Sequence, residues 1–176
     1  MSFPANPTLS KKILQRHNLS EIVLQLALNL RRKNLAQTAL NVTIAATQET
    51  YVIMKRLSKT HGLNPIEAAA LDCVEESGDA VDEVQKSIDE LGHVARGSNF
   101  WVQMSDIQTW VSAALTDEDT CMDAFDEHHM SGRVESLVPR YIVNVAHLTS
   151  NALALINRYA SVSNEAVDSE WFSGKV

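Results

Sequence analysis

ALDCVEESGDAVDEVQKSIDEL, residues 70–91, is the stretch of this chain that decides its fold. Small and apolar residues recur along it at alternating intervals of four and three, which is the spacing of a helix face buried in a bundle. Asn64 is a suitable helix cap with Pro65 at the first helical position, and Gly92 ends the pattern. The stretch therefore predicts a long amphipathic helix with this inner face: Ile66, Ala70, Cys73, Ser77, Ala80, Val84, Ile88 and Leu91.

Three more segments have helical spacing. The segment before HGLNP, residues 61–65, predicts a helix, because apolar residues recur at helical spacing at Leu35, Ala39, Val42, Ala46, Val52 and Leu57. GHVARGSNFWVQM, residues 92–104, is expected to be a loop, and Ser105 with Gln108 three residues later predicts the start of the third helix. Its inner face is expected at Ile107, Val111, Ala114, Cys121 and Phe125. The fourth helix follows HHMSGR and has the stripe Val134, Leu137, Tyr141, Val145, Leu148, Ala152, Leu155 and Tyr159.

These segments predict an all-α protein, an up-down-up-down four-helix bundle over residues 33–160 with a short N-terminal helical extension. Residues 1–32 form that extension, part of which is expected to be a short helix packed on one end of the bundle. Residues 161–176 are expected to be a flexible C-terminal tail. At 176 residues the chain is long enough for one domain with its own core.

The charges are unevenly distributed along the chain. Residues 67–127 contain sixteen Asp or Glu and two basic residues, whereas residues 1–33 contain six Lys or Arg and one Glu. The whole chain has a formal net charge of −7. An acidic surface repels phosphate backbones and anionic lipid, so nucleic acid and membranes are poor candidate partners and a basic protein is favoured. A solvated face that is acidic only for solubility fits the same charges.

Cys73 and Cys121 fall on the inward faces of the second and third helices, which are neighbours in such a bundle. A disulfide between them would close a loop of about 49 residues and stabilise the fold by about 4 kcal/mol in the chain-entropy model. Two buried thiols that pack as small hydrophobic groups are the alternative. With two cysteines in the chain, the count leaves both possibilities open.

Patterns of catalytic or metal-binding residues are weak. Glu90 and His93 have the spacing of a carboxylate-bridged di-metal motif, but Glu90 lies off the inner face and no second Glu-x-x-His completes the site. The run Asp126 to His129, at the end of the third helix, fits a solvated turn better than a metal site. No glycine-rich phosphate loop or serine elbow occurs. The chain is therefore not expected to be an enzyme, and we expect no catalytic residue, metal, cofactor or small-molecule substrate.

The outer faces of the second and third helices are polar. At about 100° per residue, the positions opposite the core of the second helix are Glu75, Asp79, Asp82 and Lys86. The corresponding positions of the third helix are Ser112, Thr116, Thr120 and Asp123. Two neighbouring helices are thus expected to present one acid-rich surface with small hydroxyl residues that allow close approach. Periodicity does not distinguish a binding surface from a solvated exterior.

Three stretches carry a family resemblance: ALDCVEESGDAVDEVQKSIDEL, SDIQTWVSAALTDEDTCMDAF and HLTSNALALINRYA, residues 70–91, 105–125 and 147–160. They resemble the plant pectin methylesterase inhibitor family, which shares its fold with the plant invertase inhibitors, and the resemblance covers residues 33–160. It implies a secreted four-helix bundle of the apoplast or cell wall. Such a protein forms a one-to-one complex with the esterase, covers its substrate cleft and limits the demethylesterification of cell-wall pectin.

The resemblance also assigns residues. Contact with the esterase is expected on the second and third helices, at Glu75, Asp79, Asp82, Thr120 and Asp123, and Thr116 joins them on the same outer face. The disulfide that family members carry between these two helices matches Cys73 and Cys121, so the resemblance implies that the two are bonded.

The N-terminal region departs from the family pattern. Members usually carry two further cysteines in an N-terminal helical hairpin and a signal peptide, and residues 1–32 show neither. Extracellular localisation is therefore expected by resemblance only.

An invertase inhibitor is an alternative function, although SNFWVQMSDIQTW, residues 98–110, lacks the Pro-Lys-Phe motif of that branch. A non-inhibitory relative of the pro-region type is another, although nothing after residue 160 resembles the start of a β-helical catalytic domain. Asn18 and Asn41 begin glycosylation sequons.

Overall fold

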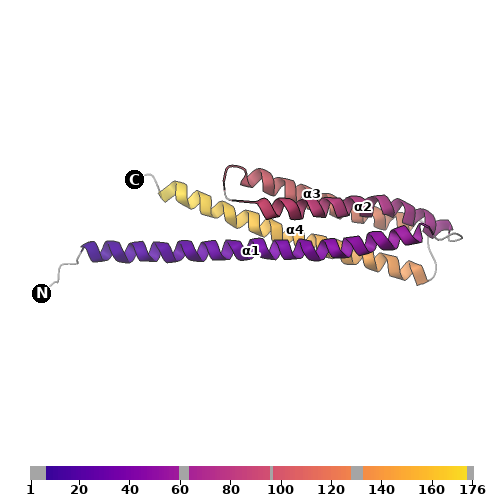
Figure 1. Ribbon diagram of the computed structural model, residues 1–176, viewed down its shortest axis with the longest axis horizontal. Coiled ribbons are helices and arrows are strands. Elements are labelled where there is room, and N and C mark those ends of the chain that lie inside the picture. Colours follow the sequence, from indigo (N-terminus) through magenta and orange to yellow (C-terminus); the bar gives the residue numbers. More distant parts are fainter. Residues whose placement is uncertain (1–6, 60–63, 96, 128–132, 174–176) are drawn as a thin grey trace.

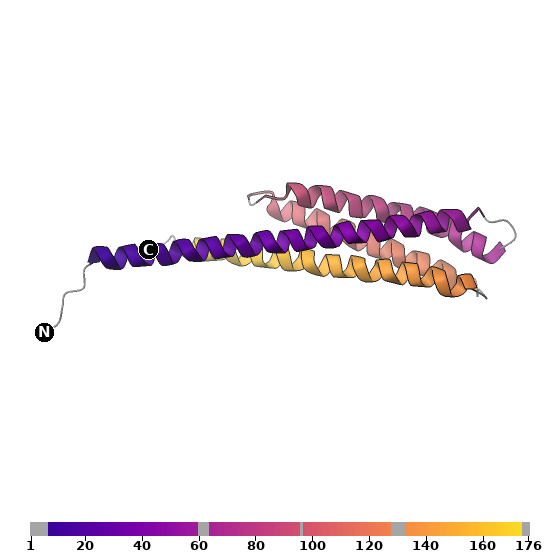
Figure 2. The same cartoon turned by 60° about the horizontal axis from the view of Figure 1, so that its bottom comes forward.

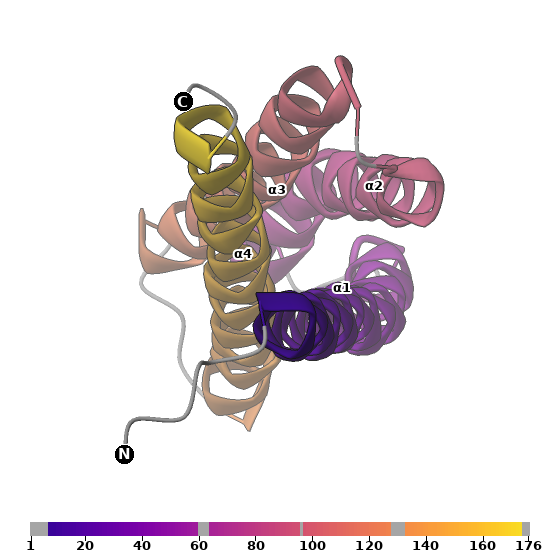
Figure 3. The ribbon, with the colours of Figure 1, turned by 90° about the vertical axis from the view of Figure 1, so that its left-hand side faces the viewer.

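The computed structural model describes the backbone of residues 7–59, 64–95, 97–127 and 133–173, and the side chains of residues 19–59, 70, 72–95, 97–125 and 138–161. The regular elements in these ranges are four α-helices, shown in Figure 1: α1 (Pro7–Leu57), α2 (Asn64–His93), α3 (Phe100–Glu127) and α4 (Arg133–Ser173). Each helix packs against the next, and α4 returns to pack against α1, so the four helices follow one another around the bundle axis (Figure 3). The predicted up-down-up-down four-helix bundle is confirmed.

α1 and α4 are longer than the sequence predicts. The expected extension is not a separate helix, because α1 is continuous from Pro7 to Leu57 and projects beyond the ends of α2 and α3 (Figures 1 and 2). α4 likewise continues through the expected tail to Ser173. The segments 8–33 and 161–173 contain neither Gly nor Pro, so nothing in them breaks a helix once it has formed. The boundaries expected at residues 32 and 160 therefore correspond to no break in the helices.

The inner faces predicted for α2 and α3 are confirmed where side chains are described. Ile66 lies outside the described side chains and Ile88 is half-buried. The other predicted positions are buried: Ala70, Cys73, Ser77, Ala80, Val84 and Leu91 on α2, and Ile107, Val111, Ala114, Cys121 and Phe125 on α3.

The apolar residues at helical spacing on α1 do not mark its most buried positions, since Ala39, Ala46 and Leu57 are half-buried. Leu35, Val42 and Val52 are 48%, 49% and 43% exposed, respectively. Between residues 35 and 57 the buried positions of α1 are Ala36, Leu40, Thr43, Thr47, Thr50 and Met54. Three of these are threonines, and each hydroxyl donates a hydrogen bond to the backbone oxygen four residues back, at 3.0 Å. Because that bond satisfies the hydroxyl inside its own helix, the threonine can be buried at little cost.

α3 begins at Phe100, not at Ser105 as predicted. A turn precedes it, in which the Phe100 N–H donates to the Gly97 oxygen at 3.1 Å and the Gln103 N–H donates to the Asn99 oxygen at 3.0 Å. Phe100 is buried and meets the Tyr159 ring edge-on, with ring centroids 5.8 Å apart. Burial of Phe100 thus adds a turn to the helix that the capping pattern at Ser105 does not reveal.

The stripe predicted for α4 is partly correct. Val145, Ala152 and Tyr159 are buried, whereas Tyr141, Leu148 and Leu155 are half-buried, and the side chains of Val134 and Leu137 lie outside the described residues. The prediction misses these buried positions: Val138, Ile142, Thr149 and Ile156. α4 packs against both α1 and α3, so its buried face is broader than a single stripe.

A lysine of α1 covers the C-terminal end of α2. Lys33 Nζ donates to the backbone oxygens of Gly92, at 3.3 Å, and Val94, at 2.8 Å. The last carbonyl groups of a helix have no partner within it, so this side chain supplies donors that the helix lacks. Burial lowers the pKa of Lys33.

The disulfide is present and joins α2 to α3 in the core. Cys73 and Cys121 have an S–S distance of 2.06 Å and a Cα–Cα distance of 4.7 Å, and both side chains are buried. Met54 of α1, Phe125 of α3 and Ile142 of α4 belong to the same buried cluster. The bond therefore lies where all four helices meet, and the pairing implied by the family resemblance is confirmed.

Removing this bond should lower the free energy of unfolding by about 4 kcal/mol, because it frees a long loop in the unfolded chain. The two residues are 48 apart in sequence. We expect the Cys73→Ala/Cys121→Ala variant, compared with the oxidised wild type in urea, to show this loss. A reductant should destabilise the wild type and leave the double variant unchanged. Equal stability of the oxidised and reduced wild type would contradict the prediction.

Candidate functional site

The candidate site is the outer surface of α2 and α3. The acidic face, as we call it here, comprises Glu75, Asp79 and Asp82 of α2 and Thr116, Thr120 and Asp123 of α3. All six side chains are exposed. The helices that carry them pack against each other and are joined through Cys73 and Cys121 on their inner sides. The structure thus places the six residues on two adjacent helices whose spacing is covalently fixed.

A second set of carboxylates lies between the two helices, and the sequence interpretation missed it. Asp117 of α3 is partly buried, and this burial raises its pKa to about 6, with repulsion from Glu76, Asp79 and Glu83 of α2 acting in the same direction. Asp79 of the acidic face is therefore close enough to α3 to repel Asp117. Glu76 and Glu83 are seven residues apart, one helical heptad, and that spacing beside the core stripe is the signal in the sequence.

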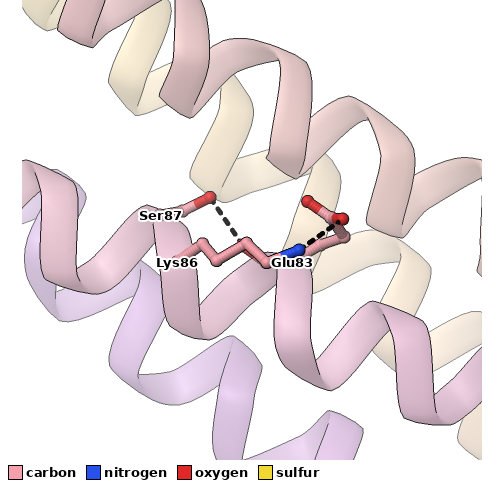
Figure 4. Close-up of polar contacts among 3 residues, drawn as sticks. All are labelled: Glu83, Lys86 and Ser87. Atoms are coloured by element: carbon pink, nitrogen blue, oxygen red, sulfur yellow. Dashed lines mark hydrogen bonds and ion pairs between the residues drawn. The ribbon is translucent and has the colours of Figure 1, made fainter.

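Little positive charge offsets these carboxylates. Lys86 is the one Lys or Arg in the sequence of α2, and α3 contains none. Lys86 Nζ donates to Glu83 Oε1 at 3.0 Å, and Figure 4 shows this ion pair beside the bond from Ser87 Oγ to the Glu83 backbone oxygen. The hydrogen bond and the charge of Glu83 raise the pKa of Lys86, and Asp82 and Asp79 add to the effect. The surface consequently has a strong negative field.

The exposed hydroxyl groups add acceptors to this surface. Thr116 Oγ1 donates to the Ser112 backbone oxygen at 3.1 Å, and Thr120 Oγ1 donates to the Thr116 backbone oxygen at 2.9 Å. Each hydroxyl hydrogen is used within α3, which leaves the oxygen lone pairs for a partner. Carboxylates and these hydroxyls therefore present acceptors, and a surface of Lys, Arg or amide donors is the complement.

No arrangement for metal chemistry appears among the described side chains. No group of three or more His, Cys, Asp and Glu side chains is placed there to hold a metal ion. The ring Nδ1 of His93 lies 2.7 Å from the Asp89 backbone oxygen, so this histidine is engaged with its own helix. His128 and His129, from the run Asp126 to His129, lie outside the described residues.

Within the described part of the chain, no helix has both the length and the apolar composition needed to cross a bilayer.

Comparison with known proteins identifies the family. The family whose model matches residues 5–155 is described as plant invertase/pectin methylesterase inhibitor. The chain belongs to this family. The match begins before residue 33, so it includes most of the region that the sequence resemblance leaves out.

Two curated relatives show how far the similarity extends. A "21 kDa protein" of Daucus carota is 47% identical over 132 residues, which are 73% of this chain and 68% of the relative. "Pectinesterase inhibitor 9" of Arabidopsis thaliana is 42% identical over 149 residues, 82% of this chain and 72% of the relative. The crystal structure of a pectin methylesterase inhibitor from Arabidopsis thaliana aligns with a TM-score of 0.60 at 23% identity, over 72% of this chain and 77% of that chain. This structure shows the shared fold.

Asp117→Asn should stabilise the folded protein at pH 7 and have little effect on its stability at pH 4. The pKa of Asp117 is raised from 3.8 to about 6, so folding disfavours the ionised form. Its contribution to stability is complete below the unfolded pKa and is lost as pH rises through the folded value. After solvent screening we expect a gain of about 1 kcal/mol at pH 7, measured by urea unfolding.

Asp119→Asn is the matched control, because Asp119 is exposed on the same turn of α3. It removes the same charge without relieving the repulsion between the helices. An equal gain from both variants, or the same effect of Asp117→Asn at both pH values, would contradict the assignment.

Proposed function

We propose that this chain is a proteinaceous inhibitor of plant pectin methylesterase. It binds the enzyme in a one-to-one complex, covers the substrate cleft and limits the demethylesterification of cell-wall pectin. The observation that carries the proposal is the acidic face, with six exposed residues on two covalently joined helices. Membership of the inhibitor family and the similarity to a protein named pectinesterase inhibitor 9 support the same activity.

The chemistry of the acidic face defines the partner surface that it fits. Glu75, Asp79, Asp82 and Asp123 supply carboxylates, and Thr116 and Thr120 supply hydroxyl oxygens. A partner surface with Lys, Arg and backbone N–H groups around its cleft would meet acceptors at each of these positions. The negative field would also accelerate the encounter with a basic enzyme.

The construction of the bundle suits inhibition by a rigid surface. α2 and α3 are regular helices, so the acidic face needs no folding step on binding and loses little conformational freedom. The disulfide holds the two helices at a fixed spacing, so their side chains can contact one partner at the same time. Such an inhibitor acts by occupying the cleft and needs no chemistry of its own.

An inhibitor of acid invertase is the second candidate, because the description of the family names both enzymes. We propose for either activity that the protein acts outside the cell, in the apoplast or cell wall. Titration of the purified chain against a pectin methylesterase and an acid invertase in parallel distinguishes the two functions. Inhibition of the esterase at a one-to-one molar ratio supports our proposal, and inhibition of the invertase alone contradicts it.

The Asp79→Lys/Asp82→Lys variant should bind the esterase more slowly and more weakly. Both side chains are exposed, so the change reverses charge on the acidic face without altering the core. We expect an association rate at least about tenfold lower at low ionic strength, with the difference shrinking in high salt. Surface plasmon resonance gives the rates, and circular dichroism should show unchanged helicity.

Glu21→Lys/Glu49→Lys is the matched control. It makes the same change in net charge at two exposed positions of α1, a helix that contributes no residue to the acidic face. A loss confined to Asp79→Lys/Asp82→Lys locates the interface on α2 and α3. Equal losses in both variants would show that net charge, rather than this face, controls binding.

A further inference from the structure

A carboxyl group lies in the interior of the bundle, next to a small cavity. Glu118 of α3 is 6% exposed, and its Oε2 has no hydrogen-bond partner within the described part of the chain. The cavity provides about 10 Å³ for the centre of a water molecule. Thr47 and Thr50 of α1, Ser77 of α2 and Asp117 of α3 supply its other polar lining. Its apolar lining includes Ile142 and Val145 of α4, so all four helices enclose this space.

The contacts of Thr149 show how many hydrogen atoms are required for the hydrogen bonds around Glu118. Its Oγ1 lies 2.7 Å from Glu118 Oε1 and 3.0 Å from the Val145 backbone oxygen. A threonine hydroxyl carries one hydrogen, and an ionised carboxylate and a carbonyl oxygen are both acceptors only. With Glu118 ionised, one of these two short contacts would lack a hydrogen. A protonated Glu118 supplies it, because the acid donates to Thr149 Oγ1 while Thr149 donates to Val145.

The threonines of α1 provide further acceptors in the lining of the cavity. Thr47 Oγ1 donates to the Thr43 backbone oxygen and Thr50 Oγ1 donates to the Ala46 backbone oxygen, both at 3.0 Å. Their hydrogens are thereby used within α1, and their lone pairs remain for a donor in the cavity. Glu118 Oε2, the carbonyl oxygen of the neutral acid, is a third acceptor. A molecule that can donate two hydrogen bonds would therefore satisfy two of these acceptors.

We propose that Glu118 is a neutral carboxylic acid in the folded protein, and that the cavity binds one water molecule, which donates to Glu118 Oε2 and to a threonine hydroxyl of α1. About 10 to 15 Å³ is the smallest space that holds a water, so the cavity accommodates one molecule. Polar groups of α1 and α3 in the cavity lining give this water the two or more hydrogen bonds that buried waters make. It completes the hydrogen bonding of a carboxyl group that the protein side chains satisfy only in part.

The surroundings of Glu118 make its ionisation costly. Burial raises its pKa to about 8; the bond with Thr149 opposes this, and the charges of Asp119 and Asp117 on α3 add to it. On the side of α2, Glu76, Asp79 and Glu83 repel Asp117 in turn. The cavity lining from α1 and α4 comprises hydroxyl and apolar side chains with no titratable group among the described residues. No cation in this set offsets a charge on Glu118.

The neutral acid makes stability depend on pH in a defined direction. The pKa of Glu118 is 4.5 when unperturbed and about 8 in the fold. Its stabilising contribution is complete below the unfolded value and is lost as pH rises through the folded value. One linked proton corresponds to a change of about tenfold in the folding equilibrium constant per pH unit across this window. The folded bundle should therefore be more stable in acid than at neutral pH.

Glu118→Gln tests this linkage, because the amide keeps the shape of the neutral acid and supplies N–H donors. Urea unfolding between pH 5 and pH 8 should show a fall in the wild-type folding equilibrium constant of about tenfold per pH unit beyond the fall in Glu118→Gln. Asp106→Asn, at an exposed position of α3 whose charge is not among those that raise the pKa of Glu118, should keep the wild-type profile. Parallel profiles for the wild type and Glu118→Gln would overturn the proposal.

Two measurements on the wild type keep the test independent of the folding of any variant. In ¹³C-labelled protein, the carboxyl resonance of Glu118 should show the neutral form at pH 6 and titrate near pH 8. A midpoint below pH 5 in the folded protein would overturn the assignment of a neutral acid. Nuclear Overhauser contacts from a long-lived water to the Thr47 or Thr50 side chain should be present, and their absence would overturn the water site.

Discussion

The bond between Cys73 and Cys121 is the constraint on which the rest of this bundle depends. It brings the backbones of α2 and α3 to a Cα–Cα distance of 4.7 Å at the centre of a buried cluster. The two helices lie side by side, and Glu76, Asp79 and Glu83 of α2 are close enough to Asp117 of α3 to raise its pKa. The repulsion at Asp117 and the placement of the acidic-face residues on neighbouring helices both follow from this packing.

Consecutive residues of α3 link that surface to the interior. Asp117 and Glu118 are about 100° apart around the helix axis, so one faces α2 while the other enters the core beside Thr149. Folding raises the pKa of both, the first through partial burial and neighbouring charge and the second mainly through burial. The same turn of helix thus connects the electrostatics of the proposed interface to hydrogen bonding among the core hydroxyls.

Sequence periodicity predicted the elements whose inner faces consist of small and apolar residues. On α2 and α3 most residue types agree with the burial, so the inner faces and the inward positions of both cysteines could be predicted, whereas their bonding was implied by the family resemblance. On α1 they do not agree. Thr43, Thr47 and Thr50 are polar by type yet buried, and exposed leucines and valines nearby give a more regular apolar pattern in the wrong register.

The same limit explains what was missed at the candidate site. The exposed members of the acidic face follow from helix geometry, since they lie opposite the core. Glu118 lies on the buried face, where rules based on residue type do not place an acid, and its burial depends on Thr149 from another helix. Asp117 and its neighbours lie at the edge of that face, where exposure depends on how closely the next helix approaches. Neither fact can be derived from one helix considered separately.

The disulfide joins the first half of the second helix to the last third of the third helix, far from the segment that connects them, so that connection carries little of the architecture. The segment between them is short, and Ala95 and Gly97 to Asn99 are exposed. A peptidase that cleaved this segment would produce a protein of two chains, held together by sulfur and by the packed core. Both halves of the acidic face would remain in place on the nicked molecule. The shape of this surface therefore does not depend on an intact peptide bond in the segment between the two helices.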